Sequence, residues 1–302
     1  MFSGKMNKSL ATAFFGKIVS FGKRVRNNKY FTRGLILISI LYTGVLFFVS
    51  IDELKQIDWR VYSSVIVIVF FVVGVSIWLQ ALSWALIMKT DEFPLRYHLL
   101  IYFKTLLMKR LPGGVWHWVG RNQLYTEEVD GKKVGMKGNV IEWLGLLMSG
   151  LSLFAITHDA SYGLIIAILL FVIYQIIYVK WFNNSIKLSV VIFFIYTVCW
   201  VLGSFMIFLL ITEGFHVIPF TFQQAVNTWT ANGTFATLLF FLPSGIIVKE
   251  FTLVFLLDGV LSFNAVILLS LQLRILMLIA EILIGIISNL FLMSNSKQLM
   301  AN

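Results

Sequence analysis

Two similar motifs combine a proline-glycine break with charged side chains in an otherwise apolar chain. LPGGV at 111–115 and LPSGI at 242–246 match position by position, and they hold two of the four prolines. Proline lacks a backbone N–H and glycine permits unusual backbone conformations, so both break helices. Groups able to bind an anion or exchange a proton follow each break. The candidate substrate-binding residues at the breaks are Pro112, Gly113, Gly114, Trp116, His117, Arg121, Pro243, Gly245, Lys249 and Glu250.

Three further candidate binding residues interrupt apolar runs that are long enough to cross a membrane. They are Glu142, Arg274 and Glu281. A charge at the centre of a membrane helix costs roughly 2.5–3.5 kcal/mol on insertion scales, so each of these residues needs a partner or a function. Arg274 and Glu281 are seven residues apart, farther than the spacing of three or four that forms an ion pair along one helix. We therefore expect each of them to pair with other groups.

The charged residues allow a functional and a structural interpretation. In the functional one, three basic residues attract an anionic head group while three carboxylates hold them in place or exchange protons. Helix N-termini after each break would donate further N–H groups to phosphate. In the structural one, the same charges form ion pairs that lock two repeats together. The basic residues are Arg121, Lys249 and Arg274, and the carboxylates are Glu142, Glu250 and Glu281.

The aromatic residues before Arg121 also allow two interpretations. Trp116 and Trp118 either line a cavity or anchor a helix at the membrane interface, where tryptophan is common. His117 either titrates near neutral pH or makes a structural hydrogen bond. If Arg121 binds a ligand, replacing it with alanine should abolish transport and leave the amount of folded protein near normal. A loss of folding would instead support the structural interpretation.

Composition places these residues in a membrane protein. Of the 302 residues, 59% are hydrophobic and 13% are charged, which is about half the charged share of soluble domains. A helix needs about 20 mostly apolar residues to cross the hydrocarbon core. The sequence therefore predicts an all-α polytopic membrane protein with about six full spans in one transmembrane domain, 34–292. The apolar runs are 34–50, 62–88, 140–157, 162–179, 188–211 and 265–292.

The distribution of charge predicts the orientation of the chain. Residues 1–33 hold eight basic and no acidic side chains, which the positive-inside rule assigns to the cytoplasm. Basic residues gather again at 89–137, so that side is also cytoplasmic, and the acidic loop around 52–58 is external. The short tail at 293–302 returns to the cytoplasm. A net charge of +10 arranged in this way reflects membrane topology, and no nucleic-acid partner is expected.

Both motifs follow segments of helical pattern that end at the proline. Residues 97–108 number only 12, too few to cross, and residues 228–241 stop at the second proline. We expect re-entrant helices that turn back at each break, since irregular backbone is tolerated at depth only where protein or water surrounds it. Three spans separate the breaks, so the hairpins at 97–121 and 228–250 would form an inverted repeat. Residues 249–263 either span the membrane or complete the second hairpin.

Taken in order, these motifs resemble a known family. LPGGVWHWVGR followed by Glu142 in VIEWLGLLMSG, and LPSGIIVKEF followed by Gly259 and Arg274, are similar to the transmembrane region of bacterial lysylphosphatidylglycerol synthases. They also resemble the wider group of flippase-like membrane proteins built on that region. The resemblance covers roughly 34–292. It implies a bacterial inner-membrane protein that moves a phospholipid between leaflets.

The resemblance also implies differences from the family. A cytosolic domain makes the aminoacylated lipid in the synthases, and the chain shows no such domain after its last span, so we expect transport without synthesis. Other stand-alone members look like partners of glycolipid or polyprenyl-phosphate pathways, which adds a cell-envelope glycolipid or a lipid-modifying enzyme as a partner. Ser244 replaces a glycine common in the family. Trp116, His117 and Trp118 are bulkier than the small residues often found there, which alters the expected cavity.

The sequence thus supports the hypothesis of a lipid flippase or transporter that handles an anionic or zwitterionic head group without a cofactor. The single cysteine and four scattered histidines predict no metal site. One alternative is an enzyme that uses His117 and Glu142 as acid and base on a lipid-linked substrate. Another is a scaffold that recruits a cell-envelope enzyme, for which Lys132 and Lys133 would matter more than Arg121.

Overall fold

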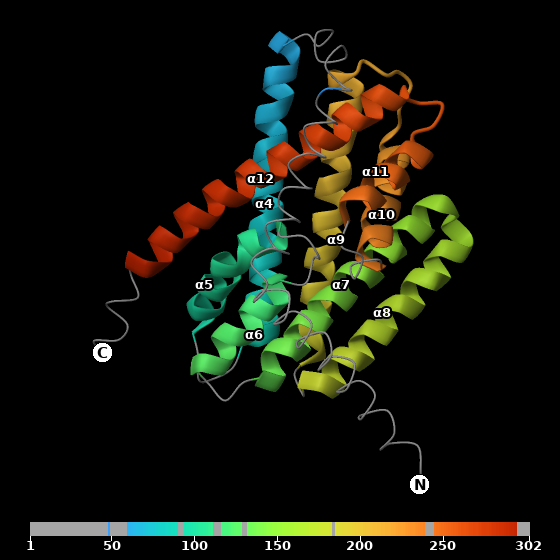
Figure 1. Cartoon of the computed structure of the whole chain (residues 1–302). Helices are drawn as coiled ribbons and strands as arrows, with labels where there is room; N and C mark the ends of the chain where they lie inside the picture. The colour runs from blue at the N-terminus through green and yellow to red at the C-terminus, as the bar shows by residue number, and fades with distance from the viewer. Residues whose placement is uncertain are drawn as a thin grey trace.

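Every regular element in the described part of the chain is a helix (Figure 1). The computed structural model describes residues 48, 59–89, 94–110, 116–128, 132–182, 185–238 and 245–294. Two single turns extend longer helices: η1 is a 3₁₀ turn after α5, and η2 is a π-helical turn after α9. The elements are α4 (Trp59–Met88), α5 (Leu95–Thr105), η1 (Leu106–Arg110), α6 (Trp116–Glu128), α7 (Lys132–His158), α8 (Ala160–Phe182), α9 (Ile186–Leu209), η2 (Leu210–Gly214), α10 (Phe222–Leu238), α11 (Gly245–Leu256) and α12 (Phe263–Ser294).

Five described segments are long and apolar enough to cross a membrane. Each overlaps a span expected from the sequence, and α7, α8 and α9 supply the three that separate the two motifs. The remaining expected span, 34–50, lies outside the described residues. The all-α prediction is confirmed, and the five helices support a membrane protein. The candidate spans are Tyr62–Met88, Gly135–His158, Ala160–Phe182, Ile186–Gly214 and Phe263–Ser288.

The segment 249–263, which the sequence left open, does not form a span. α11 ends at Leu256, and a turn leads into α12 at Phe263. Gly259 has a φ of +75° in this turn, a conformation that other residues rarely adopt. A helix of 12 residues rises only about 18 Å, which is well short of the hydrocarbon core. α11 is therefore a short helix joined by a tight turn to a long one.

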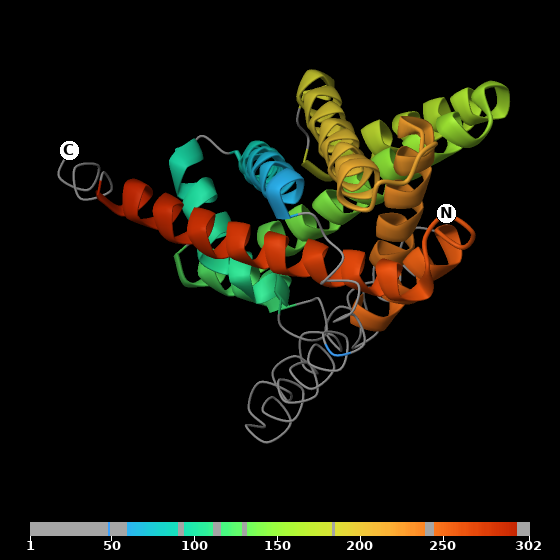
Figure 2. The same cartoon turned by 90° about the horizontal axis from the view of Figure 1, so that it is seen from above.

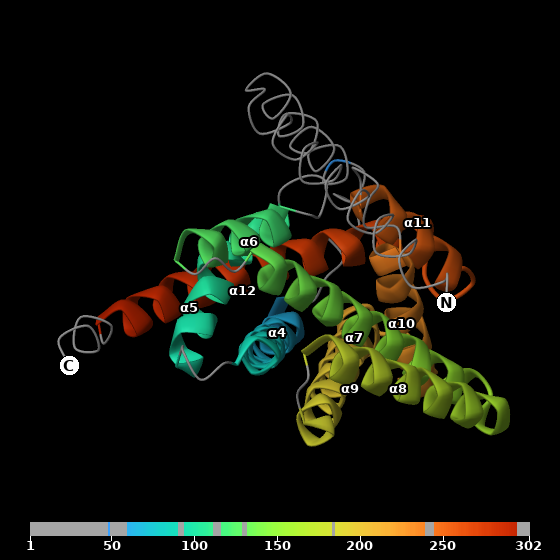
Figure 3. The ribbon, with the colours of Figure 1, turned by 90° about the horizontal axis from the view of Figure 1, so that it is seen from below.

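α4 stands at the centre of the arrangement. It packs against α5, α7, α9 and α12, and Figure 3 shows it between the α5 side and the α9 side of the protein. α12 runs obliquely across α4, as the two perpendicular views show (Figures 1 and 2). α8 lies at the outer edge against α7 and α9. Its outward face is apolar, which suits lipid tails, and includes Tyr162, Leu164, Ile165, Ile168, Leu169, Val172, Ile173 and Ile176.

Polar side chains fix where three helices begin. Asp159 is the only residue between α7 and α8, and its carboxylate accepts hydrogen bonds from the N–H groups of Ser161 and Tyr162, at 2.9 and 3.1 Å. Ser185 caps α9 in the same way. Thr221 and Gln224 form a reciprocal capping box at α10. That cap starts α10 at Phe222, six residues earlier than the apolar pattern predicted.

Close packing of α7, α9 and α10 relies on tryptophan and glycine. The indole N–H of Trp143 donates to the Thr237 carbonyl at 3.0 Å, and that of Trp200 donates to the Leu146 carbonyl at 2.9 Å. The Trp200 ring lies so close to Gly150 that a Cβ there would meet it at 2.8 Å. The two hydrogen bonds to backbone carbonyls satisfy the indole N–H groups of Trp143 and Trp200 inside an apolar bundle. These contacts place α7 firmly, and α7 carries Glu142.

The tight hairpin between α7 and α8 yields a stability prediction. A Cβ at Gly163 would lie 2.1 Å from the Ala155 backbone oxygen, whereas one at Gly285 would meet only the Leu106 side chain at 3.9 Å. We expect Gly163→Ala to lower the free energy of unfolding by about 1–3 kcal/mol, because the backbone must shift. Gly285→Ala is the matched control and should be neutral or stabilising by about 0.5–1 kcal/mol. Unfolding in mild detergent measures both; equal effects would contradict the α7–α8 packing.

Candidate functional site

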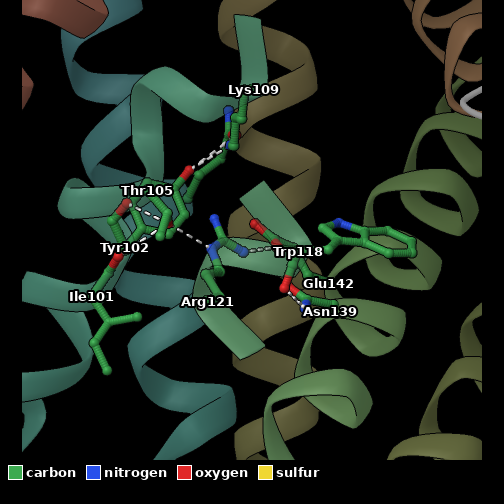
Figure 4. Close-up of polar contacts among 9 residues, drawn as sticks. Ile101, Tyr102, Thr105, Lys109, Trp118, Arg121, Asn139 and Glu142 are labelled. Carbon is green, nitrogen blue, oxygen red and sulfur yellow. Dashed lines mark hydrogen bonds and ion pairs between the residues drawn. The ribbon is translucent and has the colours of Figure 1, made fainter. Parts of the chain in front are cut away.

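A buried ion pair joins the first motif region to the helix that follows it. Arg121 on α6 donates through Nη1 to Oε2 of Glu142 on α7, and the side chains are 0% and 3% exposed (Figure 4). Burying two charges is costly unless they are paired and hydrogen-bonded. The helices that carry them are also tied together, because Asn139 on α7 donates through Nδ2 to the Trp118 carbonyl on α6 at 3.2 Å.

Aromatic rings surround the Arg121 guanidinium. Its central carbon lies 4.1 Å from the ring centroid of Trp84 on α4 and 4.5 Å from that of Tyr102 on α5. These distances are within the range of a cation–π interaction, which is stronger when the cation is desolvated. Nε of Arg121 donates to the Thr105 hydroxyl at 3.3 Å. Three elements other than α6 therefore hold the arginine in place: α4, α5 and α7.

Lys109 is a second cation in the same cluster. Its Nζ donates to the Tyr102 hydroxyl at 2.8 Å and to Oε1 of Gln80 at 3.4 Å, and lies 4.8 Å from the Tyr102 ring centroid. Tyr102 thus contacts both cations (Figure 4). Lys109 is only partly buried and lies three residues before the first motif proline, Pro112. Among the described residues, this cluster therefore holds two cations, Arg121 and Lys109, and one carboxylate, Glu142, which pairs with Arg121.

Both members of the ion pair keep a polar atom unused. Nη2 of Arg121 and Oε1 of Glu142 are buried and have no hydrogen-bond partner among the residues that the structure describes. Buried polar atoms normally bind protein, water or a ligand. The guanidinium therefore retains a donor beside Glu142, near the middle of α6.

A second ion pair occupies the corresponding place in the other half of the chain. Arg274 on α12 donates through Nη2 to Oε1 of Glu250 on α11, and the hydroxyl of Ser270 donates to the same oxygen at 2.7 Å. Glu250 is 5% exposed and Arg274 is 24% exposed. In each half, a short helix after the motif is therefore tied to the next long helix, with the cation and the carboxylate exchanged in order.

The structure separates the other expected site residues. α6 begins at Trp116 and α11 at Gly245, so a helix begins within a few residues after each motif proline. The His117 ring contacts the Trp118 ring edge-on, with centroids 6.0 Å apart. Lys249 on α11 is exposed, whereas its neighbour Glu250 is buried, and Glu281 is buried on α12. Outside the described residues lie Pro112, Gly113, Gly114 and Pro243.

Several contributors to the site were missed in the sequence. Tyr102, Thr105 and Lys109 recur at helical spacing of three and four residues, which is the signal that could have found them. In the sequence, Lys109 is one of the basic residues at 89–137 that predict the orientation of the chain in the membrane, and nothing marked it as part of the site. Trp84 carries no local signal, because it lies in an apolar run and meets Arg121 only through tertiary packing.

A neutral histidine helps to pair α5 with α6. Nδ1 of His98 and the hydroxyl of Tyr125 are 2.8 Å apart, and their rings stack with centroids 5.8 Å apart. Burial lowers the pKa of His98 to about 4. The imidazole therefore stays uncharged at neutral pH. This contact orients α6, the helix that carries Arg121.

Metal chemistry has no support in the part of the chain that the structure describes, where no group of three or more His, Cys, Asp or Glu side chains could hold a metal ion. Cys199 is a buried thiol whose Sγ lies 3.7 Å from the Ser76 carbonyl oxygen. The arrangement is suited to holding an anion next to paired charges. Comparison with known protein families, characterised proteins and solved structures finds no match to this chain.

Proposed function

We propose that this protein is a flippase-like transporter that handles the head group of an anionic or zwitterionic lipid in the bacterial inner membrane. The observation that carries the proposal is the cluster of buried Arg121 and Glu142 with partly buried Lys109, which holds more positive than negative charge within a bundle of apolar helices. The resemblance of the motifs to flippase-like membrane proteins supports the same function. Both termini would be cytoplasmic.

A lipid phosphate is the group that best complements this cluster. Charged residues inside membranes are costly and usually face an interior path or a partner. Nη2 of Arg121 has no partner among the described residues, and Nζ of Lys109 has three donor positions. Two cationic donors suit a phosphate that carries one negative charge, and hydrogen bonds between such ions are among the strongest in proteins. The acyl chains would remain in lipid.

We also propose that the two motifs form re-entrant hairpins related as an inverted repeat. The order of elements supports this: α4 to α7 and α9 to α12 each contain a long helix, two short helices flanking a motif, and a second long helix. The buried ion pair recurs between the last two helices of each set. α8 alone joins the sets, which gives them opposite orientations in a membrane. A sixth span at 34–50 would complete the protein.

Transport accounts for the cluster better than catalysis. A general acid or base needs a proton to exchange with a substrate, but one oxygen of Glu142 is bound to Arg121. His117 contacts Trp118 and lies on a different helix from Glu142. We therefore favour a carboxylate that balances Arg121 over one that attacks or protonates a lipid-linked substrate.

Lipid retention by Lys109→Gln tests the proposal. Lys109 is partly buried and hydrogen-bonded to Tyr102 and Gln80, so its replacement should leave the Arg121–Glu142 pair intact. Losing one hydrogen bond to a charged group costs about 1.5–3 kcal/mol, which corresponds to roughly tenfold to hundredfold weaker binding. We expect native mass spectrometry to find one lipid class that the wild-type protein retains and Lys109→Gln largely loses.

Lys187→Gln is the matched control, because Lys187 is an exposed lysine at the start of α9. It should retain the same lipid as the wild-type protein. Equal and unselective retention by all three proteins would contradict a head-group site at this cluster. That result would favour the alternative function, a scaffold that binds a cell-envelope enzyme.

A further inference from the structure

One face of α4 leads from the Arg121 cluster to the middle of that helix. Ser76, Gln80 and Trp84 follow one another at intervals of four residues, so they lie on the same side of α4. Trp84 is buried against the Arg121 guanidinium, whereas Ser76 and Gln80 are only partly buried. The buried end of this face therefore belongs to the ion-pair cluster, and the partly exposed end leads away from it.

Hydrogen bonds join the two polar residues of this face to α5 and η1. Nε2 of Gln80 donates to the Ser76 hydroxyl at 3.5 Å. Oε1 of Gln80 accepts from the Tyr102 hydroxyl at 3.5 Å and from Nζ of Lys109 at 3.4 Å, and Lys109 also donates to Tyr102 at 2.8 Å. These four side chains form a continuous polar strip, which consists of Ser76, Gln80, Tyr102 and Lys109.

The polar strip lies deep within a candidate membrane span. α4 supplies the span Tyr62–Met88, whose middle residue is Val75, the neighbour of Ser76. At a rise of about 1.5 Å per residue, Gln80 lies roughly 8 Å from this middle along the helix axis. The hydrocarbon core of a bilayer extends about 15 Å to each side of its centre. The polar strip therefore belongs at the depth of the lipid tails.

The ammonium group of Lys109 is itself at this depth. A lysine near a membrane surface can extend its flexible side chain toward water, but Nζ of Lys109 binds Gln80 and Tyr102. Neither of these two partners carries a charge. A charged group within a membrane usually faces a water-filled path or a polar partner, and both Lys109 and Gln80 are partly exposed. We therefore expect the exposed part of the polar strip to face water or a polar group rather than lipid tails.

The adjoining face of α4 is apolar. Val67, Phe71 and Val75 recur every four residues and are 55%, 68% and 51% exposed. Trp78 is 42% exposed, and its ring packs edge-on against Phe103, with centroids 4.8 Å apart. Such a surface suits acyl chains. α4 therefore presents an apolar face next to the polar strip, which matches the two parts of a phospholipid.

We propose that the polar strip is hydrated and carries a phospholipid head group between Arg121 and the middle of the membrane, while the acyl chains rest on the apolar face of α4. Trp84 is four residues from the end of α4 at Met88, so Arg121 lies near that end, which is expected on the cytoplasmic side. Ser76 is about 12 Å farther along the axis than Trp84.

The order of groups along the polar strip suits an anionic head group. Lys109 offers a second cation to a phosphate that leaves Arg121, and the two are connected through Tyr102 (Figure 4). Gln80 and Ser76 then supply uncharged hydrogen-bonding groups, which hold an anion less tightly than a cation does. The inference gives a route to the proposed lipid transport and rests on that function.

Thiol accessibility tests whether the polar strip is hydrated. Cys199 is the only cysteine in the chain, so Cys199→Ala provides a background without thiols. In that background, Ser76→Cys places a thiol on the polar strip, and Val75→Cys is the matched control at the same depth on the apolar face. Protein in nanodiscs of phosphatidylcholine is treated with hydroxyethyl methanethiosulfonate, which is uncharged, dissolves in water and reacts with thiolates.

We expect Ser76→Cys to react about tenfold faster than Val75→Cys or more, because a thiolate is strongly disfavoured among lipid tails. Gln80→Cys, a second position on the polar strip, should behave as Ser76→Cys does and replaces it if that variant does not fold. Full reaction of every variant after unfolding in detergent confirms that each thiol is present. Equal rates for the strip and the control would overturn the hydrated strip.

Protection by lipid tests whether head groups use the polar strip. Adding phosphatidylglycerol to the nanodiscs should slow the reaction of Ser76→Cys several-fold, and Lys109→Gln in the same chain should remove this protection. Lys187→Gln, which changes an exposed lysine on α9, should keep it. Rapid reaction that does not respond to phosphatidylglycerol would overturn the head-group route.

Two further outcomes separate this route from the site that it starts from. Soluble glycerol 3-phosphate is added in a parallel arm, and protection by it without protection by phosphatidylglycerol would assign the polar strip to a free phosphate and overturn the lipid route. An unreactive Ser76→Cys, together with lipid retention that depends on Lys109, would overturn the route and leave the head-group site standing.

Discussion

Replacing Arg121 with glutamine should lower the free energy of unfolding by about 3–5 kcal/mol, because the Glu142 carboxylate remains buried without its counterion. The two side chains are 0% and 3% exposed, so neither reaches water when its partner is removed. Glu142→Gln should have a similar effect, since Arg121 would stay enclosed by the rings of Trp84 and Tyr102. Reversible unfolding in mild detergent measures both changes.

The double variant Arg121→Gln/Glu142→Gln should recover most of the lost stability, because no charge remains buried. Lys137→Gln serves as the control on α7, where an exposed lysine should change stability by less than about 0.5 kcal/mol. Strict additivity of the two single changes in the double variant would show that the side chains do not interact. That result would contradict the ion pair.

Burial changes the meaning of the alanine test that the sequence suggested. The functional interpretation expected Arg121→Ala to fold normally, whereas the structure leads us to expect a loss of stability even if Arg121 binds a ligand. A functional role and a structural role therefore coexist in one side chain. Lys109→Gln and the neutral double variant separate them, since neither leaves a charge stranded in the cluster.

The second ion pair should respond asymmetrically to the loss of each partner. Arg274→Gln leaves Glu250 with 5% exposure and only the Ser270 hydroxyl at 2.7 Å, so we expect a loss of about 3–5 kcal/mol. Glu250→Gln leaves Arg274, which is 24% exposed and can extend its flexible side chain toward a polar region. That variant should lose less than half as much stability. The same unfolding measurement in detergent compares them.

Ser270→Ala provides a control of intermediate size. It removes one hydrogen bond to a charged group and should cost about 1.5–3 kcal/mol while leaving the ion pair in place. Equal losses for Arg274→Gln and Glu250→Gln would show that the exposure of Arg274 gives it no alternative partner. The contrast with the symmetrical first pair would then disappear.

The sequence by itself determined the helices and the kind of solvent that surrounds them. Five of the six expected apolar runs correspond to candidate spans, because a run of apolar residues long enough to cross lipid is a local property. The short helix at Tyr97 was also predicted, and it is seen as α5 with its extension η1. The predicted ends of the helices were less accurate, because caps such as Thr221–Gln224 start α10 before its apolar pattern begins.

Charged residues in apolar runs marked the candidate site for the same reason: their cost in lipid depends on the residue type and its immediate neighbours. Glu142 and Arg274 were identified in this way, and Arg121 and Glu250 from their places after the two motifs; all four belong to ion pairs in the structure. The sequence did not show which carboxylate would face which arginine. Partners 21 residues apart, such as Arg121 and Glu142, meet only after α6 and α7 have packed.

Tertiary structure alone decided what surrounds the first pair. Trp84 reaches Arg121 from α4, and Lys109 joins through Tyr102. Tryptophan and tyrosine are ordinary residues in a membrane helix, so no local pattern distinguishes these from the others. Their role depends on the rotation of each helix about its axis, and the contacts of the whole bundle set that rotation.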